Sequence, residues 1–486
     1  MNEILSSSLI IGLRSLDKSE QKLFRDWLTS PYCNRQPRLL VLYDFLLGFA
    51  PDYDAASLTA EACFQAIFAG EAFAPQRLRE QFSFLYRQLK QFWIHQELQQ
   101  TEDTDILLLR QMRKRKLNRA FATEARALDK RLSQASPLSF DHYWTQYQLS
   151  WEQTQLDAQQ GKRSEAQALP LAMEQLDLWY SLQKLKGTNE LLNRQRILRS
   201  KHPIASIQPL LAQIERSAKP LPSLLQAYYL VNQLLESGKE NDFKRLVQWL
   251  TDQQQQLPSH EVRALYKHAQ NYCIRQINEG RKRFEAALFQ LYQDQLTSGV
   301  MLENGFLLHT DFKNIVTVGL RQGEIEWVSH FMERFHNQVA APHQDNVYNV
   351  CRVSLSVAKG QISEAIRMLQ QVKFSDVYYQ LTAKHLLLSC YYQAKDWEMI
   401  PFTIASFQAF LQRNQEISSQ NRLNHLNFLK LFRRLFRLSE RQHFLNKADW
   451  KKRSLQLQQK LAEASQTAHL GWLKDQLSIL LAERPV

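Results

Sequence analysis

Residues 360–365 have the sequence Gly-Gln-Ile-Ser-Glu-Ala and lie between two segments whose apolar residues recur at helical spacing. Residues 395–397, Lys-Asp-Trp, occupy the corresponding place in the next pair of apolar segments. Ile362 and Trp397 are therefore 35 residues apart, a period that is typical of stacked helical hairpins. We expect residues 346–414 to form two consecutive helix-turn-helix units, and much of the remaining chain to continue the same arrangement.

The same offsets recur further upstream. Each expected second helix begins with a large apolar residue, and a small or apolar residue and then a large apolar residue follow three and seven positions later. These helices are expected to start near Phe243, Phe284, Ile325, Ile362 and Trp397, at intervals of 41, 41, 37 and 35 residues. Ala287 and Ala365 lie three positions after the start of their expected helices, so both are expected to be buried where adjacent helices approach closely.

This spacing of a turn residue, an apolar residue, a small residue and a large apolar residue resembles the tetratricopeptide repeat. The resemblance is clearest over residues 220–414, although Arg352 and Val353 replace the large apolar and small residues that the family usually has in its first helix. It implies an α-solenoid of antiparallel helix hairpins with a concave groove that holds a partner segment. The resemblance also implies partner-binding candidates in that groove, namely Tyr272, Lys313, Arg321, His385 and Tyr392.

The composition favours helix along the whole chain. Its 486 residues include only 13 Gly and 14 Pro, and no stretch alternates apolar and polar residues between hairpin turns. A chain of this length exceeds the usual size of one compact core, so it is either multidomain or a stack of repeats. We predict an all-α protein with an N-terminal helical domain at residues 1–100, helical repeats at 101–414 and a C-terminal helical cap at 415–486.

The first hundred residues lack the repeat pattern. Four helices are expected there, over residues 17–29, 39–48, 59–68 and 77–98. A short helix, a glycine-containing turn and a long helix also resemble the core of a winged-helix module, in which Arg77 and Arg79 would face a phosphate backbone. We favour a cap for the repeats, because this segment has 10 basic against 11 acidic residues and shows no strand pair for a wing.

The formal charge of +13 is concentrated at the C-terminal end, where residues 401–486 contain 14 Lys and Arg against 6 Asp and Glu. The helix expected between residues 423 and 441 has an apolar face on one side and a basic face on the other. Arg433, Arg434 and Arg437 on the basic face form a candidate patch for an anionic partner, either a membrane surface or a nucleic acid. A terminal helix that buries one face and solvates the other gives the same pattern, and we favour that interpretation. For the basic run at residues 113–116 we likewise favour a solvated helix end.

The sequence contains no motif for catalysis, for a cofactor or for a metal. It has no His-Glu-x-x-His, no cysteine and histidine at zinc spacing, no phosphate-binding glycine loop and no Gly-x-Ser-x-Gly. The five cysteines are scattered, which favours reduced thiols. Neither a secretory signal nor an apolar run that could span a bilayer is visible. We therefore expect a cytoplasmic, non-enzymatic protein without a cofactor or metal.

The function expected from these features is that of a scaffold that binds a protein partner in the groove of the repeats. The alternative is a nucleic-acid-associated regulator that uses the N-terminal domain or the basic C-terminal helices. Salt dependence distinguishes the two functions, because contacts with phosphates release counterions and weaken steeply as the salt concentration rises.

Overall fold

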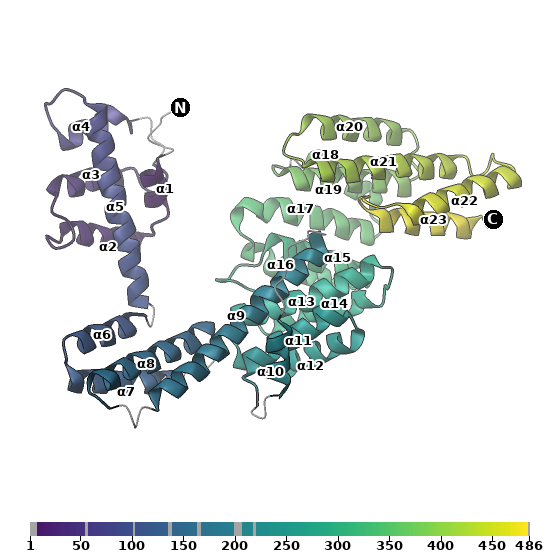
Figure 1. Cartoon of the computed structure of the whole chain (residues 1–486). Helices are drawn as coiled ribbons and strands as arrows, with labels where there is room; N and C mark the ends of the chain where they lie inside the picture. The colour runs from purple at the N-terminus through teal and green to yellow at the C-terminus, as the bar shows by residue number, and fades with distance from the viewer. Residues whose placement is uncertain are drawn as a thin grey trace. The chain divides into compact units, whose positions relative to one another are not determined.

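The computed structural model describes residues 7–53, 57–100, 103–134, 139–162, 167–198, 207–216, 220–372 and 374–484. Within these ranges the chain is helical and contains no strand, apart from two isolated β-bridges (Figure 1). The prediction of an all-α protein is confirmed. The chain divides into two compact units, one comprising Met1–Ala135 and Ser139–Tyr180 and the other continuing from Ser181. The boundaries expected at residues 100 and 414 stay a prediction.

The first unit contains eight helices in its described part and the beginning of α9. Their bounds are α1 (Ser8–Arg14), α2 (Lys18–Thr29), α3 (Pro37–Leu47), α4 (Ala60–Ile67), α5 (Pro75–Gln100), α6 (Asp103–Lys114), α7 (Asn118–Gln134), α8 (Phe140–Gln159) and α9 (Ala168–Leu198). The four helices expected in the first hundred residues are confirmed as α2 to α5. Helix α2 begins as its sequence predicts, because Asp17 and Glu20 each accept a hydrogen bond from the other's backbone N–H, at 2.8 and 2.9 Å.

Several cations of the first unit are engaged within it. Arg77 pairs with Glu71 and its guanidinium lies 4.1 Å from the centre of the Phe68 ring. Arg113, from the basic run at residues 113–116, shares the buried carboxylate of Glu152 with Arg110 at 2.7 and 2.8 Å. These contacts hold the unit together, and no strand that could serve as a wing occurs in its described residues.

The second unit is a longer series of helices that continues from α9. Their bounds are α10 (Gln208–Arg216), α11 (Ser223–Ser237), α12 (Glu240–Gln253), α13 (Ser259–Asn278), α14 (Phe284–Thr297), α15 (His309–Arg321), α16 (Ile325–Phe335), α17 (Ala341–Ala358), α18 (Ile362–Gln371), α19 (Val377–Gln393), α20 (Met399–Arg413), α21 (Ser419–Glu440), α22 (Lys447–Glu463) and α23 (Leu470–Glu483). Three of the five expected helix starts are confirmed to the residue, at Phe284, Ile325 and Ile362; α12 begins three residues before its expected start, and α20 two residues after.

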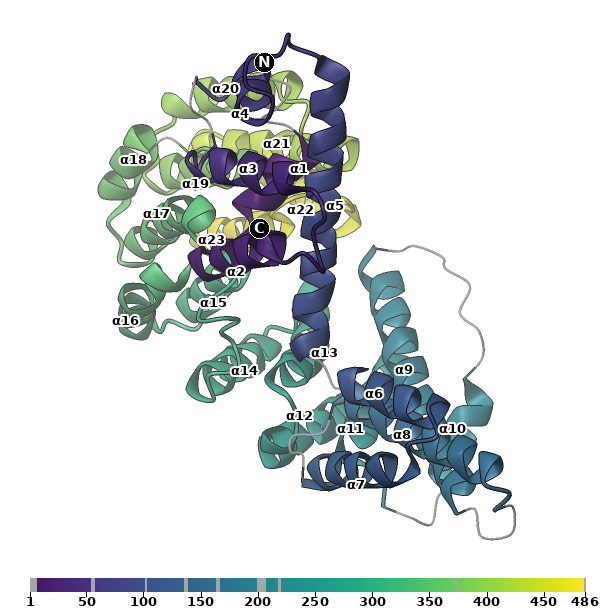
Figure 2. The same ribbon diagram turned by 90° about the vertical axis from the view of Figure 1, so that its left-hand side faces the viewer.

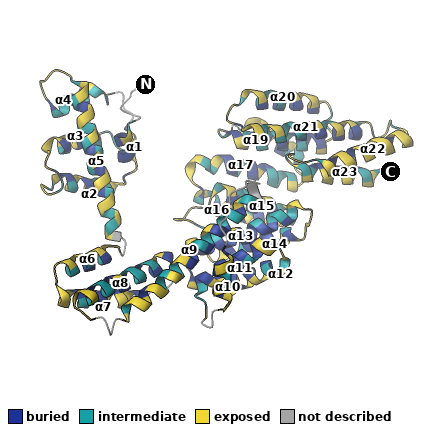
Figure 3. Cartoon of the chain, in the orientation of Figure 1, coloured by how far each residue is buried: buried dark blue, intermediate teal, exposed yellow. Residues whose placement is uncertain are grey.

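Helices of this unit pack mainly against their neighbours in the sequence. From α11 to α20 each helix contacts the next one, and α11, α15 and α17 also contact the second helix after them (Figure 2). Most of these helices bury one side and expose the other, whereas α11 and α19 are covered nearly all round (Figure 3). A chain built in this way forms its core from short-range contacts.

The turns before α16, α18 and α20 share one backbone pattern. Gly323, Gly360 and Lys395 have φ angles of 80°, 75° and 54°. In each turn the next N–H donates to a carbonyl five residues earlier, at 2.9 to 3.0 Å, in the pairs Glu324 to Gly319, Gln361 to Ser356 and Asp396 to Tyr391. This left-handed ending suits glycine, which lacks a Cβ, and is unfavourable for lysine.

Replacing Lys395 by glycine is therefore expected to raise the free energy of unfolding by about 1 kcal/mol. The relief of left-handed strain in the folded state outweighs the loss of stability that comes from the greater freedom of the unfolded chain. The reciprocal change Gly360→Lys is the matched control. Nothing lies within 4 Å of a Cβ built at Gly360, so the lysine would introduce strain without a clash, and a loss of similar size is expected. Urea denaturation measures both values, and a destabilised Lys395→Gly variant would contradict the argument.

The two small residues expected at close helix contacts differ in how far they are buried. Ala365 is fully buried, as predicted. Ala287 is only half-buried, and the prediction for it is wrong: α14 turns Leu288 and Leu291 inward instead. A close helix contact involves Gly319 on α15, where an added Cβ would lie 2.5 Å from Cγ2 of Val328 on α16. The sequence analysis did not single out this glycine.

Candidate functional site

Helices α21, α22 and α23 pack against one another at the C-terminal end of the chain (Figure 1). The apolar side of α21 lies in their common core, where Leu429, Phe432 and Leu435 are fully buried. The apolar face that the sequence shows between residues 423 and 441 is thus covered by the protein itself, apart from Leu423, which is exposed at the start of the face. This half of the amphipathic pattern is not available for insertion into a bilayer.

The exposed side of α21 and the adjacent side of α22 form two adjoining open hollows of about 150 and 330 Å³. We refer to them together as the basic groove. Five cations contribute to its lining, namely Lys430, Arg434, Arg437, Arg453 and Lys460. The polar residues of the lining are Asn427, Gln456, Ser465 and Thr467. No acidic side chain is among the described residues that line the groove.

Helical spacing arranges these cations in two rows. Lys430, Arg434 and Arg437 follow one another at intervals of four and three residues, which places them on one side of α21. Arg453 and Lys460 are separated by seven residues on α22 and share a side in the same way. Seven residues of α-helix span about 10 Å, so both rows extend along the groove for roughly that distance.

The five cations of the basic groove form no ion pair or hydrogen bond with any residue in the described part of the chain. Like charges held close together repel one another, and a bound anion relieves this repulsion. Guanidinium groups bind phosphate or carboxylate oxygens in pairs, and lysine contributes a point charge. The arrangement is therefore suited to a ligand that carries several negative charges along its length.

The basic groove includes two of the three residues predicted for an anionic partner. Arg434 and Arg437 line it, whereas Arg433 is half-buried and donates a hydrogen bond of 2.7 Å to Gln408 on α20. The predicted patch did not include Lys430 of the same helix, nor Arg453 and Lys460, which belong to another helix. Their spacing of seven residues was the available signal.

Three of the five residues predicted to face a partner in the repeat groove are buried. Tyr272 stacks on Phe243 with ring centroids 4.9 Å apart. His385 and Tyr392 on α19 are covered by the C-terminal helices. Their expected exposure is not found, because aromatic side chains at these positions are drawn into the packing between helices.

The C-terminal helices supply the contacts that cover α19. His385 Nε2 lies 2.7 Å from Nδ1 of His425 on α21, and its ring centroid is 4.1 Å from that of His469. Tyr392 makes an edge contact with Trp472 of α23 at 5.7 Å. The chain itself thus occupies the side of α19 where the resemblance placed a partner.

The remaining two predicted residues reach the surface. Lys313 is half-buried, and Arg321 is exposed and pairs with Glu285 at 3.4 Å. These two cations lie on the same helix, α15, and the described structure does not bring them together with the residues of the basic groove.

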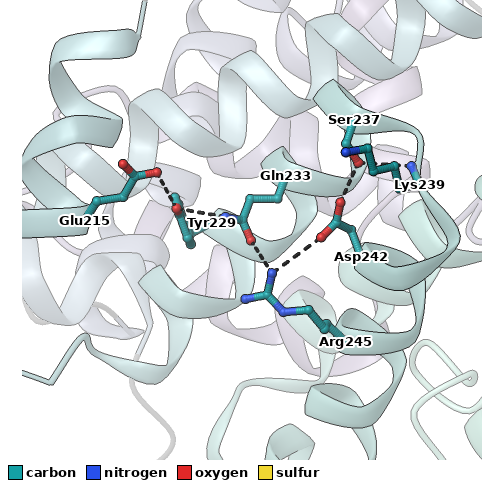
Figure 4. Close-up of polar contacts among 7 residues, drawn as sticks. All are labelled: Glu215, Tyr229, Gln233, Ser237, Lys239, Asp242 and Arg245. Carbon is teal, nitrogen blue, oxygen red and sulfur yellow. Dashed lines mark hydrogen bonds and ion pairs between the residues drawn. The ribbon is translucent and has the colours of Figure 1, made fainter.

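Other polar clusters in the second unit tie helices together. A chain of hydrogen bonds joins α10, α11 and α12, from Glu215 through Tyr229 and Gln233 to Arg245 and Asp242 (Figure 4). Burial and the neighbouring Glu215 raise the pKa of Tyr229 to about 12. This tyrosine therefore stays protonated and donates to Glu215.

The buried carboxylate of Glu261 on α13 also has hydrogen-bonding and charged partners on neighbouring helices. It accepts a hydrogen bond of 2.5 Å from the hydroxyl of Tyr228 and lies 2.8 Å from the ammonium of Lys186. Asn189 donates to the backbone carbonyl of Tyr228 at 2.8 Å and accepts from Asn232 at 2.9 Å. This network connects α9, α11 and α13 through paired donors and acceptors.

Four of the five cysteines are buried thiols without the surroundings that activate a nucleophile. Burial raises the pKa of Cys63, Cys273, Cys351 and Cys390 to about 12, so these thiols are not activated nucleophiles. The described residues contain no group of three or more metal-binding side chains that could hold an ion, and no helix among them is long and apolar enough to cross a membrane. Comparisons of the chain with family models, curated proteins and solved structures gave no match.

Proposed function

We propose that the protein is a non-enzymatic helical-repeat scaffold that binds the phosphate backbone of a nucleic acid in the basic groove. The observation that carries this proposal is the set of five unpaired cations, arranged in two rows without an acidic residue in the lining. Phosphate contacts supply most of the affinity of nucleic-acid-binding proteins that lack sequence preference. The groove provides such contacts on two rigid helices.

The proposed scaffold is a tetratricopeptide-like array of helix hairpins over residues 223–413. Its support is the contact of each helix with the next and the common left-handed turn before α16, α18 and α20. In this proposal the repeats carry α21 to α23 as a C-terminal cap, and the cap bears the binding surface. Burial of Tyr272, His385 and Tyr392 weighs against a partner held at those positions.

A nucleic acid fits the groove better than a membrane or an acidic protein does. The apolar side of α21 is buried, so the helix lacks the exposed apolar face that membrane-bound amphipathic helices use. A nucleic acid carries a phosphate at every nucleotide, so it presents negative charge along the whole length of both rows of cations. Binding to an acidic polypeptide is accordingly an alternative outcome of the test below.

Removing three charges from the groove is expected to weaken nucleic-acid binding about 100-fold at 0.1 M salt. The variant carries Arg434→Gln, Arg437→Gln and Arg453→Gln. Each phosphate contact on a single strand contributes about 0.7 to the slope of log affinity against log salt, so three contacts remove roughly two decades of affinity and about two from the slope. Fluorescence anisotropy of a labelled 20-nucleotide strand at several salt concentrations measures both quantities.

The matched control removes the same charge outside the groove. Lys447, Lys451 and Lys452 are exposed on α22 and do not line either hollow. Their replacement by glutamine should change the affinity only slightly. Equal losses in the two triple variants would assign binding to overall charge, and binding of polyglutamate without binding of the oligonucleotide would assign the groove to an acidic protein.

A further inference from the structure

The turn between α21 and α22 lies at one end of the hairpin that these two helices form, beyond the cations of the basic groove, and it carries an exposed aromatic side chain. Residues 441–445 form this turn, and Phe444 within it is 87% exposed. A single exposed apolar residue is common on protein surfaces and needs no explanation. Phe444 differs in its position, because the turn joins the two helices whose facing cations line the groove.

The turn that carries Phe444 is fixed in place by the end of α23. Arg484 donates hydrogen bonds to the carbonyl oxygens of Leu445, at 2.9 Å, and of Gln442. Its guanidinium lies 5.1 Å from the centre of the Trp450 ring, and the indole N–H of Trp450 donates to the carbonyl of Arg484 at 3.1 Å. The neighbours of Phe444 are thus anchored while its ring stays in solvent, so little freedom would be lost when a ligand binds it.

We infer that the nucleic acid bound in the basic groove is single-stranded and that one of its bases stacks on Phe444. This inference rests on the function proposed above. Bases of a single strand have free faces that stack on aromatic side chains without regard to sequence, whereas the bases of a duplex are stacked on one another. A strand of B-DNA carries one phosphate per about 3.4 Å and an unstacked strand is more extended, so the roughly 10 Å covered by each row of cations spans at most about three phosphates.

The geometry of the groove also favours one backbone over two. Packed helices have axes 8 to 10 Å apart, so cations from α21 and α22 can approach one phosphate chain from both sides. A duplex presents two phosphate chains separated by the width of a groove. The two rows of cations could then not contact the same phosphate chain, and fewer of the cations would make contact.

The test compares the intact protein with Phe444→Ala on a labelled 12-nucleotide strand. We expect the affinity to fall about tenfold, with an unchanged salt slope, because stacking contributes to affinity without releasing counterions. Phe444→Trp should restore the affinity. The matched control is Phe402→Ala, which removes another exposed phenylalanine, 71% exposed on α20, and should leave the affinity unchanged.

Two further probes isolate the base and the strand. An abasic strand of the same length should bind the intact protein as weakly as the ordinary strand binds Phe444→Ala, and a duplex should bind at least several-fold more weakly than the strand. Equal binding of duplex and strand, or an unchanged affinity in Phe444→Ala, would overturn the inference while the groove variants still test the proposed function. Failure of any oligonucleotide to bind at low salt would overturn both. Retention on phosphatidylserine vesicles alone, lost in Phe444→Ala, would assign the turn to a membrane.

Discussion

Replacing Gly319 by alanine is expected to lower the free energy of unfolding of the second unit by about 2 to 3 kcal/mol. The new Cβ would lie 2.5 Å from Cγ2 of Val328 and 3.2 Å from the ring of Phe289. Valine is branched at Cβ and has little rotamer freedom, and Val328 is fully buried. The contact can be relieved only by moving α15 away from α16, which disturbs a closely packed core.

The control for Gly319 is a glycine in an open helical position. Gly187 lies within α9, is exposed, and has nothing within 4 Å of a Cβ built on it. Alanine at this position should raise the free energy of unfolding by about 0.5 to 1 kcal/mol, because alanine is the better helix former. The two substitutions are chemically identical and are expected to act in opposite directions in urea denaturation. Stabilisation by both would contradict the close approach of α15 and α16.

Acidification from pH 8 to pH 5 is expected to destabilise the second unit by about 2 kcal/mol through His268 alone. Burial lowers the pKa of His268 from 6.5 to about 4, an effect that Glu190 opposes and Arg275 reinforces. The folded protein therefore binds fewer protons than the unfolded chain between these two values. Stability is retained above pH 7, falls as the pH drops through 6.5, and reaches its full loss below pH 4.

His385 contributes to the pH dependence in the same direction. Burial, and after it the neighbouring His469 and His425, lower its pKa well below 6.5. Its protonation would place a charge between α19 and the C-terminal helices. The described side chains in contact with its ring are those of Phe407, His425, Phe428 and His469, and none of these is acidic. The C-terminal helices are thus expected to loosen together with the rest of the unit as the pH falls.

Variants without the titrating group test the origin of the pH effect. In His268→Leu the difference in the free energy of unfolding between pH 8 and pH 5 should shrink by about 2 kcal/mol, whatever the variant does to stability at pH 8. His330 is exposed on α16, and His330→Leu should keep the wild-type difference. An unchanged difference in His268→Leu would show that other groups control the acid sensitivity.

The positions of the helices could be predicted from the sequence because they depend on local information. Apolar residues at helical spacing and turn residues between them located the starts of α14, α16 and α18 to the residue. The capping pair of Asp17 and Glu20 likewise acts over three positions and is visible in the sequence. The basic character of the C-terminal segment is a matter of composition and needs no structure.

The surroundings of each side chain were decided only by tertiary packing. Helical periodicity assigns Tyr272, His385 and Tyr392 to a side of their own helices, but whether that side is buried depends on which neighbour covers it. For His385 and Tyr392 on α19, the covering helices include α23, which begins about 80 residues after α19 ends. The basic groove has the same origin, since Arg453 and Lys460 join Arg434 only when α22 folds back along α21. A helix of 3.6 residues per turn specifies its own faces, whereas the rotation and pairing of helices follow from the fit of the whole core.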